Sequence, residues 1–99
     1  MLKLSLFARL EAKPGKEDVA TFLKQGLELA TREATTPLWF ALRLGPTTFA
    51  VFDAFLDETG RENHLNGPIA KALMSQAATL LASPPTIERA DVIGAKVQQ

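Results

Sequence analysis

The chain has 99 residues, 46% of them hydrophobic and 22% charged, which predicts one domain over residues 1–99 with a single hydrophobic core. Eleven basic and eleven acidic residues give a formal net charge of zero, so neither nucleic acid nor an anionic membrane is expected as a partner. The chain has no cysteine, which excludes disulfides, thiolate metal sites and thiol nucleophiles. No signal peptide or bilayer-spanning run is recognisable, and we expect a cytoplasmic protein.

Two different periodicities mark the first third of the chain. Residues 2–10 alternate between Leu or Ala and other residues, the pattern of a strand. After Lys13-Pro14-Gly15, apolar residues recur at helical spacing, which predicts a helix from Lys16 to about Glu33. Gly26 lies within the apolar stripe of this helix. Its cost of about 1 kcal/mol in helix propensity suggests that the helix approaches a sheet closely there.

The remainder of the chain predicts a hairpin, two further helices and a last strand. Residues 38–44 and 48–56 are expected to pair as antiparallel strands. Asp57 is a candidate N-cap for a short helix through Asn63, and Pro68 suits the first position of a second helix that runs to about Ala82. Residues 86–97 are predicted to form the fourth strand.

This element order predicts an α+β fold, namely the ferredoxin-like βαββαβ sandwich with a four-stranded antiparallel sheet. The helices should cover one sheet face and leave the other without cover within the chain. The sequence leaves open which alternation of each strand faces the helices. A small chain with an open apolar face favours a homodimer formed through the sheet faces. The candidates for the open face are Ser5, Phe7, Arg9, Trp39, Ala41, Arg43, Val51, Asp53 and Phe55.

His64 is the only histidine in the chain. Its unperturbed pKa of about 6.5 makes it a candidate general base at neutral pH. The alternative is a histidine at a helix end that makes an ordinary hydrogen bond. One histidine without cysteine does not make a self-contained zinc site, and we predict no metal.

Asp53 lies in the middle of an apolar strand, where a buried carboxylate needs a partner. Arg43 on the neighbouring strand of the hairpin is the predicted partner. Such an ion pair could have a structural role, in which it fixes the strand register or the dimer interface. The alternative is that it polarises a ligand.

Aromatic residues are concentrated in the predicted hairpin. They either fill the core or line a pocket for a flat aromatic ligand. The six glycines form no phosphate-binding motif, so a nucleotide or flavin cofactor is not expected. The hairpin aromatic residues are Trp39, Phe40, Phe49, Phe52 and Phe55, with Phe7 and Phe22 able to join them.

Several motifs of the chain together resemble the antibiotic biosynthesis monooxygenase (ABM) family. These motifs are Lys13-Pro14-Gly15 between a strand and a helix, Thr48–Asp53 (TFAVFD), and His64-Leu65 before a helix begun by proline. The resemblance covers nearly the whole chain. It implies a dimeric α/β barrel of ferredoxin-like subunits, and oxygenase activity on quinols or anthrones with neither metal nor flavin.

By the same similarity, Asp53 matches the family's acidic residue at the end of the third strand, and His64 matches its helix histidine. Phe55 stands where the family commonly has tryptophan. The family's Glu-Pro-Gly before the second strand is replaced by residues 33–37, EATTP, and the chain has no tyrosine. Mechanisms that use a tyrosine hydroxyl therefore do not transfer to this chain.

The resulting hypothesis is a cofactor-independent monooxygenase that uses O₂ on a small phenolic or quinol-type aromatic substrate. His64 would remove the phenolic proton, a transfer that is uphill by about 5 kcal/mol on reference pKa values of about 10 and 6.5. A cation is therefore needed to stabilise the phenolate, and Arg43 is the candidate. The substrate-binding candidates are Trp39, Phe55, Asn66 and Phe7.

Three alternatives stay open. The chain could be a non-catalytic dimeric module that binds a small molecule, or a structural dimer with a vestigial pocket. A haem-degrading relative is the third alternative. It is less favoured, because the helix after Pro68 offers Met74, Ser75 and Gln76 where that branch has an iron-ligating histidine.

Overall fold

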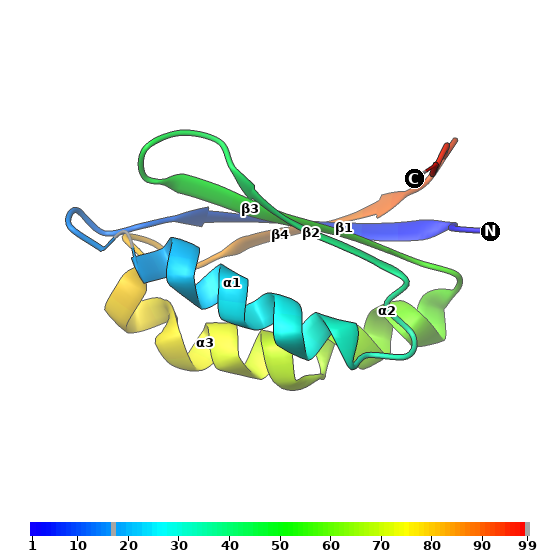
Figure 1. The fold of residues 1–99 in the computed structure, drawn as a ribbon, viewed down its shortest axis with the longest axis horizontal. Coiled ribbons are helices and arrows are strands. Elements are labelled where there is room, and N and C mark those ends of the chain that lie inside the picture. The colour runs from blue at the N-terminus through cyan, green and yellow to red at the C-terminus, as the bar shows by residue number, and fades with distance from the viewer. Residues whose placement is uncertain (17, 99) are drawn as a thin grey trace.

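The computed structural model describes residues 1–16 and 18–98. Four antiparallel strands form one sheet in the order β2-β3-β1-β4. All the helices lie on the same face of this sheet (Figure 1). The predicted ferredoxin-like α+β fold is therefore confirmed. In chain order the elements are β1 (Leu4–Glu11), α1 (Asp18–Thr31), β2 (Leu38–Arg43), β3 (Thr48–Phe55), α2 (Glu58–Leu65), α3 (Pro68–Leu80) and β4 (Thr86–Asp91).

The predicted elements all occur, and the last strand shows the largest difference in length. β4 ends at Asp91, although the prediction ran to Val97. Asp91 pairs with Leu4, the first residue of β1, so residues 92–98 have no β1 residue opposite them, and only the Val92 N–H extends the ladder with a 2.8 Å hydrogen bond to the carbonyl oxygen of Lys3. None of the helices in the described ranges is long and apolar enough to cross a membrane.

The short helix α2 begins at its predicted N-cap and ends at Leu65, two residues beyond the predicted Asn63. The side chain of Asp57 accepts a hydrogen bond of 2.9 Å from the backbone N–H of Gly60, which satisfies a free N–H of the first turn. Asn66 follows as the C-cap, Gly67 is the N-cap of α3, and Pro68 opens α3. These caps fix the direction of α2 under the sheet.

Gly60 also explains why α2 can pack closely against the loop before β2. A Cβ atom at this position would lie 2.9 Å from the backbone oxygen of Thr35. Gly26 differs, because a Cβ there would lie 3.5 Å from the ring of Trp39, an ordinary van der Waals contact. The predicted close approach at Gly26 thus exists, but it does not exclude a methyl group.

The strand register decides which residues face the helices, and it corrects the expected open face. Trp39 lies opposite Asp53, Ala41 opposite Val51, and Arg43 opposite Phe49. These residues and Phe55 point toward the helices, so placing Trp39, Ala41, Arg43, Val51, Asp53 and Phe55 on the open face was wrong. Only Ser5, Phe7 and Arg9 remain there. Apolar residues alternate on both faces of β3, so its pattern alone gave no orientation.

The core lies between the sheet and the helices. It joins β1, β3 and α1 and extends to the segment after α3. Three of its members, Leu10, Val19 and Phe49, are at most 2% exposed. The buried residues of this core are Leu10, Ala12, Val19, Leu23, Phe49, Val51 and Leu81.

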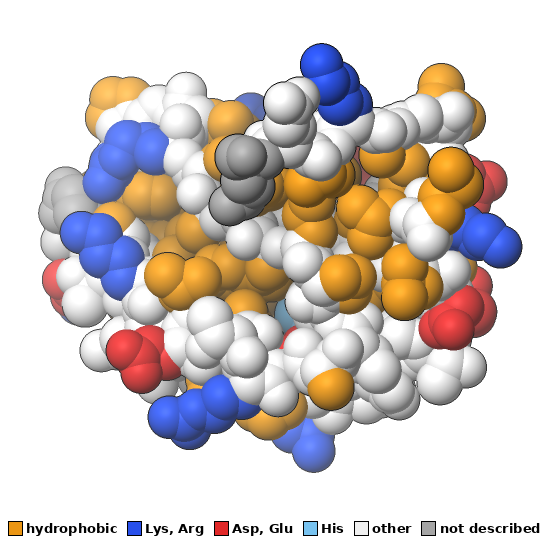
Figure 2. Space-filling model, turned by 45° about the vertical axis from the view of Figure 1, so that its right-hand side comes forward, with side chains coloured by type: hydrophobic (Ala, Val, Ile, Leu, Met, Phe, Trp, Pro, Cys, Tyr) orange, Lys and Arg blue, Asp and Glu red, His pale blue; other side chains and the backbone are white. Residues whose placement is uncertain are grey.

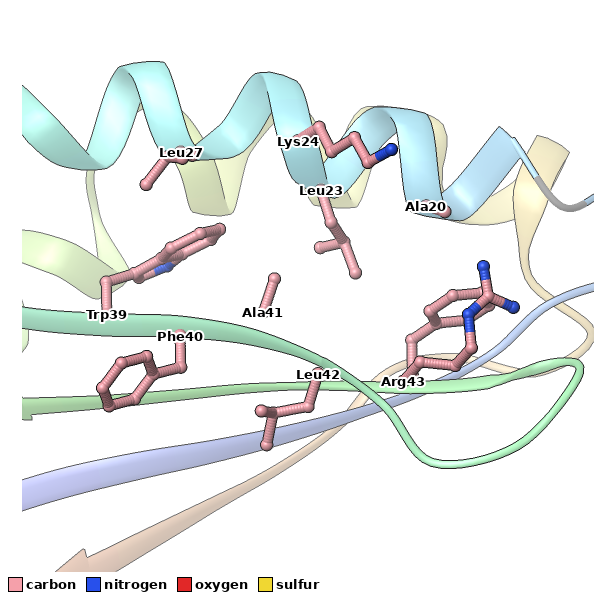
Figure 3. Close-up of a pocket in the computed structure, with 10 residues that line it drawn as sticks. Ala20, Leu23, Lys24, Leu27, Trp39, Phe40, Ala41, Leu42 and Arg43 are labelled. Atoms are coloured by element: carbon pink, nitrogen blue, oxygen red, sulfur yellow. The ribbon is translucent and has the colours of Figure 1, made fainter.

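The opposite face of the sheet has no helix over it (Figure 1). Phe40 and Leu42 project from β2 away from α1 (Figure 3), and they are 50% and 39% exposed. Phe7 and Phe52, which are paired across β1 and β3, lie on this same face. We call these four residues the open-face cluster.

Candidate functional site

The only histidine lies near the end of α2 and is buried between two carboxylates. Nδ1 of His64 is 2.6 Å from Oε1 of Glu33, and Nε2 is 2.9 Å from Oδ2 of Asp53. His64 is 7% exposed and Asp53 is 2% exposed. Figure 2 accordingly shows the histidine colour only as a small area among hydrophobic side chains. We call Glu33, Asp53 and His64 the carboxylate–imidazole cluster.

These contacts favour the protonated imidazole. A neutral imidazole donates from one nitrogen only, whereas the imidazolium donates from both, so both contacts of His64 are hydrogen bonds only in the protonated form. Burial lowers the pKa of His64, but the hydrogen bonds and charges of Asp53 and Glu33 raise it, and the pKa lies above its ordinary value of 6.5.

Two neighbours hold the cluster in place. The hydroxyl of Thr36 donates to Oε1 of Glu33 at 2.8 Å, so that this oxygen accepts two hydrogen bonds. The ring of Phe55 lies 5.5 Å from the imidazole ring, centroid to centroid. Phe55 is fully buried, and it therefore shields the cluster from solvent on this side.

Three polar atoms in this region are buried without a hydrogen-bond partner among the described residues. They are Oδ1 of Asp53, Oε2 of Glu33 and Nε1 of Trp39. Asp53 and Trp39 lie opposite each other across β2 and β3. Because buried polar groups are normally paired, this arrangement favours a water molecule or a ligand hydroxyl close to the carboxylate.

An apolar cavity of about 510 Å³ lies between α1 and β2. Leu23 and Leu27 line it from the helix, and Trp39 and Ala41 line it from the strand (Figure 3). Its volume is typical of small-molecule sites. Trp39 belongs to the wall of this cavity and lies opposite Asp53 in the strand register, whereas Glu33, Asp53 and His64 do not line the cavity.

The charged residues that line this cavity, among those that the structure describes, are both basic. Lys24 comes from α1 and Arg43 from the end of β2, and both side chains lie toward the Ala20 end of the cavity (Figure 3). Arg43 packs over the ring of Phe49 at 4.7 Å, and its Nη1 donates to the carbonyl oxygen of Pro46 at 3.3 Å. In the described part of the chain, neither cation forms an ion pair with a carboxylate.

The structure brings together some of the predicted site residues and separates others. His64, Asp53 and Phe55 are in contact, whereas the predicted pair of Asp53 with Arg43 is wrong. Arg43 lies opposite Phe49, four residues along β3 from Asp53, and His64 supplies the positive partner of Asp53 instead.

Two predicted substrate-binding residues lie outside this region. Phe7 is on the opposite sheet face, paired with Phe52. Asn66 uses its side chain to donate to the carbonyl oxygen of Glu62 at 2.9 Å, and it is exposed. Neither residue lines the cavity between α1 and β2.

The sequence interpretation missed two residues of this region. Glu33 was assigned only as a helix end, although it is the glutamate of the segment compared with the family's Glu-Pro-Gly. Lys24 was not noted, although it directly follows Leu23 of the apolar stripe. In both cases the signal was a charged residue at the boundary of a predicted apolar helix face.

Comparison with solved structures places the chain in a family. The NE2512 protein of unknown function from Nitrosomonas europaea is 59% identical, with a TM-score of 0.96 over 100% of this chain and 97% of that one. The chain belongs to the same family as NE2512. No protein-family model matches the chain, and a search of the curated proteins likewise gives no match.

More distant structures of this family's fold include an antibiotic biosynthesis monooxygenase. That structure is 15% identical, with a TM-score of 0.77 over 92% of this chain and 99% of its own. PA3566 from Pseudomonas aeruginosa is 20% identical, with a TM-score of 0.80 over 95% and 97% of the two chains. The resemblance to ABM proteins that the sequence predicted is thereby confirmed at the level of the fold.

Proposed function

We propose that this protein is a homodimeric, cofactor-independent monooxygenase of a small phenolic or quinol-type aromatic substrate. The observation that carries the proposal is the apolar cavity between α1 and β2, whose Trp39 wall adjoins a buried acid/base cluster. The substrate ring would lie against Trp39, Leu23 and Leu27. The shared fold with an antibiotic biosynthesis monooxygenase supports the same reaction class.

In this proposal the substrate is its own reductant. Loss of a phenolic proton gives an electron-rich anion that transfers electrons to O₂. A hydroquinone and O₂ yield a hydroxyquinone and water, since one oxygen atom enters the ring and the other leaves as water. Four electrons pass from the substrate to O₂, so no external reductant is required.

The proton acceptor in this mechanism is the carboxylate–imidazole cluster as a unit. Both nitrogens of His64 already face carboxylate oxygens, so we reassign the accepting atom from the imidazole to Oδ1 of Asp53. This oxygen has no partner among the described residues. His64 is then a positioning residue that holds the carboxylate through the 2.9 Å contact of its Nε2 with Oδ2. Arg43 stabilises the phenolate, as cations do for charge that develops in a reaction.

Oxygen uptake with a panel of hydroquinones tests this function. We expect consumption of O₂ by the wild type above the rate of autoxidation, and a loss of at least tenfold in kcat for Asp53→Asn and Arg43→Gln. Asp91→Asn, a change of an exposed carboxylate at the end of β4, is the matched control and should keep full activity. Circular dichroism checks that both variants keep the wild-type fold. If they do and still consume O₂ at the wild-type rate, the proposal is contradicted.

A second candidate is a non-catalytic binding module. It is favoured by one observation, namely that His64 offers no free nitrogen to a substrate proton. This candidate predicts a rise in Tm on addition of aromatic ligands, with no oxygen consumption. Oxygen uptake that depends on Asp53 would exclude it.

A further inference from the structure

The charge of the cavity between α1 and β2 differs from the charge of the whole chain. The chain contains eleven basic and eleven acidic residues, yet among the described residues the charged side chains that line this cavity are Lys24 and Arg43, with no acidic one. A single phenolate that forms during the reaction needs only one of these two cations. The two cations together can therefore balance the phenolate and one further negative group of the ligand.

Arg43 is held ready to bind an anion. Its guanidinium packs over Phe49 at 4.7 Å, and one hydrogen bond to the carbonyl oxygen of Pro46 uses Nη1. Nε and Nη2 have no hydrogen-bond partner among the described residues. A guanidinium fixed in this way keeps two neighbouring donors for the two oxygens of a carboxylate, and little side-chain entropy remains to be lost on binding.

The remainder of the cavity is apolar. Leu23, Leu27 and Ala41 offer no hydrogen-bonding side chain, and Trp39 offers an aromatic ring. In Figure 3, Trp39 lies at the opposite end of the cavity from Arg43. A ligand that matches both ends has a flat hydrophobic ring system near Trp39 and a negative group near Lys24 and Arg43.

We infer that the ligand of this cavity is an aromatic carboxylate, and that Arg43 and Lys24 together balance its permanent negative charge and that of the phenolate. The inference rests on the proposed function in taking this cavity as the substrate site, and it narrows the substrate to a phenol or quinol that carries a carboxylate. The carboxylate orients the ring, and the hydroxyl is the group that reacts.

Trp39 provides a direct reporter of occupancy. It is the only tryptophan in the chain, which has no tyrosine, so fluorescence excited at the tryptophan band comes from the cavity wall. The probes are 2-naphthoate and 2-naphthamide, which share the ring and differ in charge. Neither is a quinol, so the assay measures binding without turnover.

We expect the wild type to bind 2-naphthoate at least tenfold more tightly than 2-naphthamide at low ionic strength, and added salt to reduce this preference. The variant Lys24→Gln/Arg43→Gln should bind the two probes within twofold of each other. Lys3→Gln/Lys71→Gln removes the same charge from positions outside the cavity, and it should keep the preference of the wild type.

Three results would overturn the inference: equal affinity of the wild type for both probes, a preference that survives in the Lys24→Gln/Arg43→Gln variant, or no quenching of Trp39 by either probe. Failure of the proposed function is distinguishable from these. If the protein prefers 2-naphthoate but consumes no O₂ with 1,4-dihydroxy-2-naphthoate, the inferred ligand class is supported and the proposed oxygenase activity is contradicted.

Discussion

At the scale of single residues, the central feature is one imidazole held by two carboxylates. Removing one partner from a buried charged group is costly, because the other is left without compensation. The protonated form of His64 is therefore stabilised by Asp53 and Glu33, whose hydrogen bonds and charges raise the pKa of the imidazole. The same contacts that stabilise the imidazolium prevent it from acting as a free base.

The titration of His64 tests this interpretation directly. As the only histidine, it gives one Hε1 and one Hδ2 resonance in the proton NMR spectrum. We expect a pKa above 6.5 in the folded protein, with a decrease in both Asp53→Asn and Glu33→Gln. The decrease should be larger for Asp53→Asn, since the Asp53 hydrogen bond raises the pKa most. A folded-state pKa below 6.5 would contradict the protonated cluster.

A pH dependence of stability follows from the same shift. A group whose pKa is higher in the folded state than in the unfolded state stabilises the fold fully below the unfolded value, here about 6.5. This contribution is lost as the pH rises through the folded-state pKa. The free energy of unfolding in urea should thus fall on going from pH 6 to pH 9. The decline should be smaller in Asp53→Asn, and an equal decline in that variant would assign the effect to other groups.

At the scale of elements, α2 is positioned by its N-cap and by its contact with the loop before β2. The cap of Asp57 and the absence of a side chain at Gly60 together let α2 present His64 to the sheet. A displacement of α2 away from the sheet by a few tenths of an ångström would lengthen the contact between His64 and Asp53.

Two glycine substitutions separate close packing from helix propensity. Gly60→Ala places a methyl group 2.9 Å from the Thr35 carbonyl oxygen, and because backbone must move, we expect a loss of about 1–3 kcal/mol in the free energy of unfolding. Gly26→Ala meets only the Trp39 ring at 3.5 Å, and helix propensity should make it neutral or stabilising by up to about 1 kcal/mol. Urea denaturation measures both, and equal effects would refute the distinction.

The elements could be predicted from the sequence better than the site. Period-two and helical spacing and the residues Asp57 and Pro68 were sufficient for the order and approximate limits of the elements. The orientation of β3 could not be predicted, because Phe52 and Phe55 make both of its faces apolar. The partner of Asp53 could not be predicted either. It depends on the orientation of β3 and on the path of α2, and both are set by contacts between segments far apart in the chain.

At the scale of the whole molecule, the layered architecture leaves one sheet face without a covering helix among the described residues. The open-face cluster of Phe7, Phe40, Leu42 and Phe52 is apolar, and no helix of the described residues covers it. Since contiguous exposed apolar patches mark interaction sites, we propose that the two copies of the homodimer meet here.

Sedimentation measurements test this arrangement. We expect a species of twice the chain mass of 10.7 kDa, and a shift to the single chain in Phe40→Asp, because a carboxylate would be buried without a partner at the interface. Met74→Asp is the matched control, since Met74 is an exposed hydrophobic residue of α3. A monomeric wild type, or dissociation by Met74→Asp alone, would rule out the sheet-face dimer.

The carboxylate–imidazole cluster also restricts how such a sequence can diverge. Its three members come from three separate segments, and each single loss leaves a buried charge or an unpaired oxygen behind. Joint replacement by apolar residues avoids that cost. Covariation of positions 33, 53 and 64 is therefore the evolutionary record that this structural arrangement should leave among homologous proteins.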